Sequence, residues 1–223
     1  MTAQNKENIE KEFRFGCKRC GNCCTDKKML VNVTYSDIIR IKNGLGLNAD
    51  ELLEILGFYI VENNLYEELK DKLVVSPLTT DKGSTYIGLL KKSSGQCYFY
   101  DDKNKKCLIY NLRPLVCRTF PFTFQIIFNK EDRTKAKIKM DYTEKGKQYC
   151  PGIGIDAPLI EEEDWITIGK QTVEEMHYNH ILIEKWNEAV RKKKITPKAE
   201  NFLFNILKLE DQQQKKTYSS KRE

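Results

Sequence analysis

Four cysteines lie within eight residues near the beginning of the chain, in the order Cys17-Lys-Arg-Cys20-Gly-Asn-Cys23-Cys24. Three of the sulfurs recur at intervals of three residues, so a tight loop can bring them to one centre. The fourth, directly next to the third, points elsewhere or reaches a second atom. Thiolates at such spacings are typical ligands of zinc and of iron–sulfur clusters. The cluster therefore predicts a metal site.

Four more cysteines follow at wider intervals: Cys97, Cys107, Cys117 and Cys150. Cys97 and Cys107 flank a polar turn at 101–106, so closure of this hairpin-like loop brings their sulfurs together. A single cysteine is usually a small buried hydrophobe. Eight cysteines, four of them clustered, instead favour a role as ligands. We therefore predict that all eight bind metal.

The even number of cysteines also fits four disulfides. The chain begins with a polar segment that contains acidic residues, so we expect no signal peptide. Disulfides are rare in the cytosol, where thiols stay reduced. We therefore expect a cytoplasmic protein, and the disulfide arrangement is the weaker alternative.

Cationic side chains lie close to several of these cysteines in the sequence. Lys18 and Arg19 lie inside the first cluster, and Arg113 and Arg118 flank Cys117. Ligating thiolates carry negative charge, which such cations offset by donating hydrogen bonds to sulfur. Lys18 and Arg19 fit an ordinary surface equally well, whereas we expect Arg113 and Arg118 to be buried and paired.

The segment that contains Cys117 has two prolines, Pro114 and Pro121. Each fixes φ and discourages regular structure around it. The sequence therefore predicts a rigid, irregular loop, which suits a ligand better than core packing does.

Two arrangements of metal fit these spacings. In the first, Cys17, Cys20 and Cys23 bind three irons of a [4Fe–4S] cluster, and Cys150, followed by proline as in bacterial ferredoxins, is the candidate fourth ligand. In the second, eight thiolates form two zinc sites or one multinuclear site, with Cys23 and Cys24 divided between centres because adjacent side chains usually diverge. The regular interval of the first three favours iron–sulfur over zinc, and both stay open.

Helix and strand signals indicate an α+β fold. A capping box at Thr34 and Asp37 opens a helix that Gly44 and Gly46 end. The other expected helices are 49–56, 58–73, 160–194 with a break at Gly169, and a last helix that Pro197 opens. The expected strands are 29–33, 84–90, 96–100, 122–128 and 135–140, of which the last two pair as antiparallel.

We therefore expect small antiparallel strands and short helices around irregular cysteine-rich loops, with a helical C-terminal extension. The cysteine-cluster domain covers 1–157. The extension covers 158–223 and ends in a basic tail that we expect to fray.

The chain of 223 residues is 40% apolar and 31% charged, and no stretch approaches 18 uncharged apolar residues. We therefore expect no membrane span. The net charge of +6 is concentrated in 191–198 and in the tail. Such runs are usually solvated, and nucleic-acid binding would need exposed aromatic residues among the basic ones. A nucleic-acid partner is therefore a weakly supported alternative.

The full cysteine pattern comes with the segment Cys107-x-Ile-Tyr110-x2-Arg113-Pro114-x2-Cys117-Arg118-x-Phe120-Pro121-Phe122. Together they resemble the YkgJ-type CxxCxxCC cysteine-cluster family from about residue 13 to 152. Members are described as zinc- or iron-chelating domains, so the resemblance implies chelation of a metal or an iron–sulfur cluster by the cysteines. Flagellin lysine N-methylases carry a similar pattern, which implies one enzymatic relative.

Three functions stay open: a metal- or cluster-binding protein, an enzyme, and a zinc-module adaptor that binds nucleic acid or a protein partner through the basic late helices. No glycine-rich loop suits S-adenosylmethionine, because Gly152-Ile-Gly154 lies in the wrong context. His177 and His180 share one helix face but lack an acidic partner motif, so we expect surface or packing roles. Whether the protein is an enzyme is left undecided.

Overall fold

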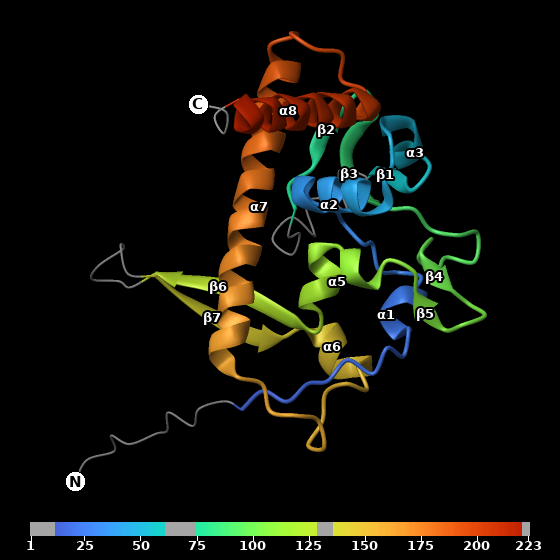
Figure 1. Cartoon of the computed structure of the whole chain (residues 1–223), viewed down its shortest axis with the longest axis vertical. Coiled ribbons are helices and arrows are strands. Elements are labelled where there is room, and N and C mark those ends of the chain that lie inside the picture. Colours follow the sequence, from blue (N-terminus) through green and yellow to red (C-terminus); the bar gives the residue numbers. More distant parts are fainter. Residues whose placement is uncertain (1–11, 61–74, 129–135, 220–223) are drawn as a thin grey trace.

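The computed structural model describes residues 12–60, 75–128 and 136–219 (Figure 1). Its helices are α1 (Asn22–Thr25), α2 (Tyr35–Leu45), α3 (Ala49–Leu53), α5 (Leu115–Thr119), α6 (Glu144–Tyr149), α7 (Glu162–Arg191) and α8 (Ala199–Ser219), with a 3-10 turn at Tyr110–Leu112. Its strands are β1 (Leu56–Ile60), β2 (Leu78–Thr80), β3 (Gly83–Leu89), β4 (Tyr100–Asp101), β5 (Lys106–Cys107), β6 (Phe122–Phe128) and β7 (Ala136–Tyr142). These elements confirm the predicted α+β class and the helical C-terminal region.

Helix α2 begins and ends where its sequence predicts. The amide of Asp37 donates to Thr34 Oγ1 at 3.2 Å, and the amide of Thr34 donates to Asp37 Oδ2 at 3.0 Å, which completes the capping box. Gly46 ends the helix at φ 69°, in the left-handed conformation that glycine adopts without strain. The buried side chains of Ile38 and Ile41 then direct one face of the helix into the core.

Three strands form an antiparallel sheet in the order β1-β3-β2. In its register Leu56 of β1 pairs with Leu89 of β3. The segment 29–33, predicted as a strand, lies beside β3 but forms only the bridge between Asn32 and Gly88. It stays this short because helix α2 begins directly after it.

The main core lies between this sheet and helices α2, α7 and α8. It includes Ile41 from α2, Leu78 from β2, Trp186 from α7 and Leu203 from α8, all buried. Burying each such side chain stabilises the fold by about 1.5–3 kcal/mol. Because α7 and α8 supply part of this core, the C-terminal helices stabilise the same fold that carries the cysteines.

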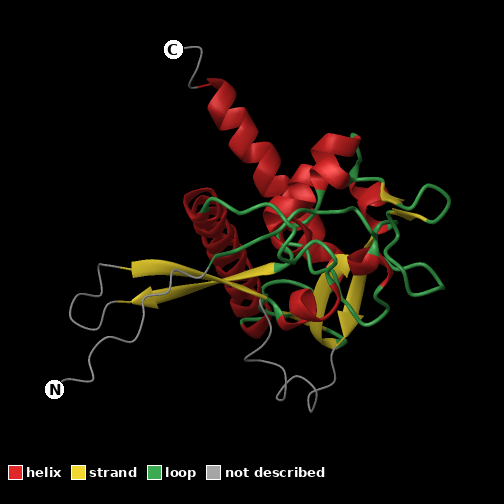
Figure 2. Ribbon diagram, turned by 90° about the horizontal axis from the view of Figure 1, so that it is seen from below, coloured by secondary structure: helices red, strands yellow, loops and turns green. Residues whose placement is uncertain are grey.

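Strands β6 and β7 form the predicted antiparallel hairpin, which extends away from the rest of the fold (Figure 2). Helix α7 packs across it and continues without the break expected at Gly169. A Cβ at this position would lie only 2.6 Å from Phe124 Cδ1. The expected break is wrong because this glycine serves close packing and does not end the helix.

A second, aromatic core ties the beginning of the described chain to this hairpin. Phe13 and Phe122 are buried, and the ring of Trp165 lies 4.4 Å from that of Phe122 between centroids. The amide of Ile160 donates to the carbonyl of Phe13 at 2.9 Å. The N-terminal segment is thereby held against the loop that precedes α7, as Figure 1 shows.

Other expectations about element boundaries need correction. Helix α3 ends at Leu53, and Leu56 already belongs to strand β1, because residues 56–60 find hydrogen-bond partners along β3. The expected helix 58–73 is therefore wrong at 58–60, and its remainder lies outside the described residues. Within 96–100 only Tyr100 is in a strand.

The start of the last helix also differs from expectation. Pro197 lies before α8, which begins at Ala199, because the carbonyl of Pro197 accepts from the amide of Asp81 at 2.7 Å. The helix continues to Ser219, although we expected the chain to fray after about residue 211. Within the described ranges, no helix has the length and apolar character needed to cross a membrane.

Candidate metal centre

All eight cysteines line one cavity of about 150 Å³. The elements that carry or adjoin them, α1, β4, β5, α5 and α6, lie together on one side of α7 (Figure 1). All eight lie in the described part of the chain, and each is a free thiol. Segments far apart in the sequence therefore bring their sulfurs to one place.

The first cluster lies on a tight loop that leads into helix α1. Gly21 caps this helix at φ 80°, and a Cβ there would lie 2.5 Å from the hydroxyl of Tyr100. Only glycine fits this position, since it needs both a positive φ and room for the tyrosine. Cys17 and Cys20 are exposed before the turn, while Cys23 lies after it in α1.

The adjacent pair behaves differently from expectation. The sulfurs of Cys23 and Cys24 lie 4.0 Å apart, so the two side chains converge instead of diverging. Both cysteines belong to the four-residue helix α1, which begins at the Gly21 turn. This placement brings both sulfurs into the cavity lining. Two thiolates on one tetrahedral zinc ion lie about 3.8 Å apart. If Cys23 bound one metal centre and Cys24 another, the two centres would therefore be direct neighbours.

The hairpin around 101–106 forms as predicted. Strand β4 pairs with β5, with Tyr100 opposite Cys107. The amide of Tyr100 donates to the carbonyl of Cys97 at 3.0 Å, and the amide of Cys97 donates to the carbonyl of Cys24 at 2.8 Å. Backbone hydrogen bonds therefore hold Cys24, Cys97 and the hairpin of Cys107 together.

Cys117 lies in a helix, where we expected an irregular loop. Pro114 occupies the N-cap of α5, so its missing N–H leaves no helical hydrogen bond unmade. The amide of Cys117 donates to the carbonyl of Pro114 at 2.9 Å. The expectation is wrong because a proline at the start of a helix fits its geometry and does not prevent it.

Cys150 ends helix α6 and lies next to the first cluster. Its amide donates to the carbonyl of Gly146 at 3.0 Å. Two residues later, the carbonyl of Gly152 accepts from the amide of Gly16 at 3.0 Å. The side chain of Asn22 also donates to the carbonyl of Tyr149 at 3.1 Å. The chain on both sides of Cys150 is thus bonded to the loop of Cys17 and Cys20.

The thiols have unequal acidities. A hydrogen bond from the Cys24 thiol lowers the pKa of Cys107 to about 6 and that of Cys23 to about 7. The pKa of Cys24 itself is raised because it donates to Cys107 and Cys23 and is partly buried. Burial raises the pKa of Cys97, Cys117 and Cys150. Cys107 is therefore mostly a thiolate at neutral pH, and Cys23 is partly one.

Five cationic side chains line the cavity together with the cysteines: Lys18, Arg19, Lys105, Lys106 and Arg113. No aspartate or glutamate is among the lining residues of the described chain. Arg113 lies over the ring of Tyr110 at 3.9 Å, donates to the carbonyl of Cys117 at 3.3 Å, and its charge lowers the pKa of Cys107. The electrostatic environment therefore favours thiolates.

The expected pairing of Arg118 is observed, although its partner lies away from the cavity. It forms an ion pair with Glu175 of α7 at 3.2 Å. Sequence patterns gave no indication of Glu175, because the pairing joins segments 57 positions apart. The cavity-lining rings of Tyr100, Tyr110 and Tyr149 were likewise not predicted.

Among the residues that the structure describes, no three cysteine, histidine, aspartate or glutamate side chains already form a group that could hold a metal ion. The donors nevertheless fit zinc or iron, since eight soft sulfur ligands line a cavity that is rich in cations. Binding therefore requires the sulfurs to move closer together. His177 and His180 lie on the exposed face of α7 and are absent from the lining.

Residues 16–151 match the CxxCxxCC family, described as a "putative zinc- or iron-chelating domain". The match covers more than half of the chain and includes every cysteine. The chain belongs to the CxxCxxCC family. The zinc- or iron-chelating character of the family agrees with a cavity lined by thiols. Helices α7 and α8 lie beyond the matched residues.

A protein similar to this chain occurs in Methanocaldococcus jannaschii. It is named "Uncharacterized protein MJ0661" and is 29% identical over 150 residues, which are 67% of this chain and 63% of the relative. The chain thus spans slightly less than two thirds of that protein's length. No solved structure was found to match this chain.

Proposed function

We propose that this protein binds iron, as an iron–sulfur cluster, or zinc through its eight cysteines. The observation that carries the proposal is the convergence of eight free thiols on one cavity. Packing alone gives no reason for this gathering, because Cys17 and Cys20 are exposed in a loop and Cys150 is only half-buried at the end of α6. A reducing cytoplasm would keep all of them available for metal.

The backbone hydrogen bonds support two groups of four ligands. The first group is Cys17, Cys20, Cys23 and Cys150, since the loop of Cys17 is bonded to the segment after Cys150. Burial is the largest cause that raises the pKa of Cys150, and the nearby charges of Cys20, Cys17 and Cys23 raise it further. This set follows the ferredoxin-like spacing, so it favours a [4Fe–4S] cluster.

The second group is Cys24, Cys97, Cys107 and Cys117. The amide of Cys97 is bonded to the carbonyl of Cys24, and hydrogen bonding to Cys107 is the largest cause of the raised pKa of Cys24. Cys97, Cys107 and Cys117 all pack against the main core. Four thiolates around zinc carry a net charge of about −2. The five cationic side chains of the lining would offset the negative charge of two such centres.

Anaerobic purification followed by metal analysis tests the proposal. Broad visible absorption with about four iron and four sulfide per chain supports one cluster, and about two zinc ions in a colourless protein support two zinc sites. A folded protein that binds neither metal, or that contains four disulfides, contradicts the proposal.

Paired substitutions test the division into two groups. Cys20→Ser should remove the metal of the first group and leave that of the second, whereas Cys107→Ser should do the reverse. Each variant is the matched control for the other, since both exchange sulfur for oxygen at a single ligand. Metal content unchanged in Cys20→Ser would exclude Cys20 as a ligand. Loss of all metal in both variants would indicate one indivisible centre.

A further inference from the structure

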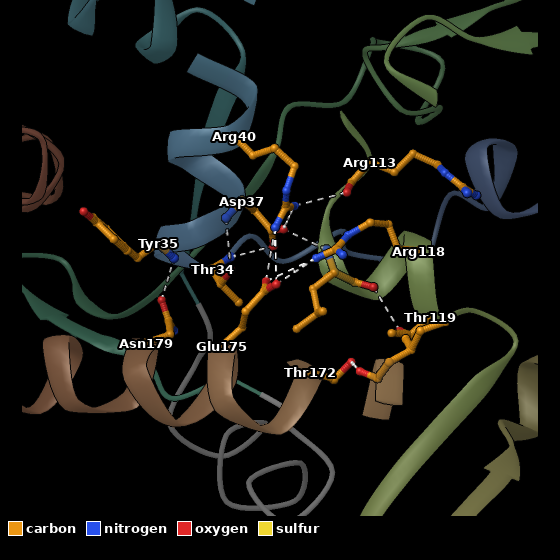
Figure 3. A network of polar contacts seen from close by, with 12 residues as sticks. Thr34, Tyr35, Asp37, Arg40, Arg113, Arg118, Thr119, Thr172, Glu175 and Asn179 are labelled. Atoms are coloured by element: carbon orange, nitrogen blue, oxygen red, sulfur yellow. Dashed lines mark hydrogen bonds and ion pairs between the residues drawn. The ribbon is translucent and has the colours of Figure 1, made fainter. Parts of the chain in front are cut away.

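A buried carboxylate outside the cavity holds the helix that carries Cys117. The side chain of Asp37 has no solvent exposure and accepts three hydrogen bonds, shown in Figure 3. The donors are the amide of Thr34 at 3.0 Å, the amide of Leu115 at 2.9 Å and Arg40 Nη1 at 2.7 Å. Helix α2 is thereby joined to the first residue of α5.

The two peptide groups around Pro114 are both held by this network. Arg40 Nη1 donates to the carbonyl of Arg113 at 3.4 Å, and the amide of Leu115 donates to Asp37. Pro114 has no amide hydrogen to donate. The carbonyl of Arg113 and the amide of Leu115, on either side of it, therefore make the hydrogen bonds that attach the start of α5 to α2. Cys117 is the third residue of the helix that begins there.

Helix α7 completes the network with a single carboxylate. Glu175 lies between two guanidinium groups, at 3.3 Å from Arg40 Nη2 and 3.2 Å from Arg118 Nη2. Its side chain is 21% exposed, so its ion pairs are only partly screened by water. Without this charge, two cations would face each other across the gap between α2 and α5 (Figure 3).

We propose that Asp37, Arg40 and Glu175 are positioning residues for the metal centre, which fix α5 so that Cys117 reaches the cavity. The same network also fixes the backbone position of Arg113, whose guanidinium donates to the carbonyl of Cys117. The inference rests on the proposed function, because it assigns these residues a role toward the bound metal. It also gives α7, beyond the matched family residues, a part in the site.

The substitution Glu175→Gln tests the inference in the full-length protein, with Co²⁺ as the probe. It keeps the size of the side chain but removes its charge. Loss of residues that orient metal ligands typically weakens binding 10–100-fold, so we expect the Kd for Co²⁺ to rise about tenfold. The thiolate-to-cobalt absorption should fall as well, since Cys117 is no longer held in place. Glu174→Gln is the matched control, because Glu174 is the exposed neighbour on α7 and should bind as the wild type does.

A double-mutant cycle separates positioning from general stability. In a Cys117→Ser background, Glu175→Gln should not weaken Co²⁺ binding further, because the ligand through which it acts is gone. Glu175→Asp keeps the charge and should retain most of the affinity. If Glu175→Gln does not fold, Arg118→Gln breaks the same ion pair from the α5 side and should have the same effect.

Unchanged Co²⁺ affinity and absorption in a folded Glu175→Gln or Arg118→Gln variant overturns the inference, even where the melting temperature falls. An equal further loss in the Cys117→Ser background also overturns it. Failure of the wild type to bind Co²⁺, in a protein that also contains neither zinc nor an iron–sulfur cluster after anaerobic purification, overturns the proposed function itself. The wild-type measurement therefore distinguishes the two failures.

Discussion

Cys24 is the hydrogen-bond donor of the cysteine cavity. Its sulfur lies 4.0 Å from that of Cys23, and hydrogen bonding to Cys24 lowers the pKa of both Cys107 and Cys23. Metal ligands must be deprotonated, so if these sulfurs bind metal as we propose, Cys23 and Cys107 should bind before Cys24.

In the metal-free, reduced protein, alkylation should reveal this order. Cys107, with a pKa of about 6, and Cys23, with a pKa of about 7, are thiolates above those pH values and should react at neutral pH. Cys24, whose pKa is raised, should react only in alkaline solution. Iodoacetamide labelling across pH 5–10 with peptide mass spectrometry measures each site.

Two results would contradict this prediction: modification of Cys24 before Cys107, or the same pH dependence for both. Protein loaded with Zn²⁺ is the control, since bound metal should protect all three sulfurs.

Helix α7 is the element that connects the parts of the fold. Gly169 lets it approach the β6–β7 hairpin, Glu175 reaches α2 and α5, and Trp186 enters the main core. The three contacts follow one another along a single continuous helix of 30 residues. The helix therefore fixes the distance between the hairpin, the ion pairs of α2 and α5, and the core.

The substitution Gly169→Leu should separate α7 from the hairpin. Even a Cβ would lie 2.6 Å from the ring of Phe124 and 3.1 Å from Ile138 Cγ2. Overpacking of this kind typically costs about 1–3 kcal/mol of unfolding free energy. Urea denaturation measures the loss. Lys170→Leu is the matched control at the exposed next position and should change the stability by less than about 0.5 kcal/mol. Equal stabilities of the two variants would contradict this role of Gly169.

Elements whose signals are local could be predicted from the sequence. The capping box of Thr34 and Asp37 and the alternation in 122–128 gave α2 and the hairpin, because neighbouring residues determine both. Gly169 was misinterpreted because its role depends on Phe124, which is distant in sequence. The prediction for Cys117 failed because proline has opposite effects at the start and in the interior of a helix.

The candidate site was predictable in composition but not in arrangement. Residue types identified all eight cysteines as candidates, and the cavity contains all eight. The convergence of Cys23 and Cys24 to 4.0 Å depends on the Gly21 turn and on Tyr100, so no spacing rule could give it. Glu175 had no signal, since an isolated glutamate on a helix is ordinary.

At the scale of the whole molecule, the cysteine cavity adjoins the main core, and Val31, Leu89 and Ile109 belong to both. The core consists of apolar side chains from the sheet, α2, α7 and α8, including Ile41 and Leu203. The rest of the cavity lining comes mostly from loops and short helices. We therefore expect the core to stay folded without metal, and the order of the cysteine loops to depend on bound metal.

Removal of metal by a chelator should loosen the cavity and leave the core folded. Amide hydrogen exchange should become faster at Cys24 and Cys97, whose backbones are joined across the cavity, and stay slow at Ile41 and Leu203. The melting temperature should fall, because metal binds only the folded protein. Global unfolding on chelation, or exchange that is unchanged everywhere, would contradict this separation.

The bond between Gly16 and Gly152 has a consequence for synthesis of the chain. The loop that contains Cys17 leaves the ribosome early, but the segment to which it is bonded is made more than 130 residues later. At about 5–20 residues per second, that interval lasts roughly 7–27 s. During this time the first cysteines are exposed on an incomplete chain and are accessible to oxidants and to the wrong metal. A metal site that uses Cys17 together with Cys150 could therefore be completed only after both segments have been synthesised.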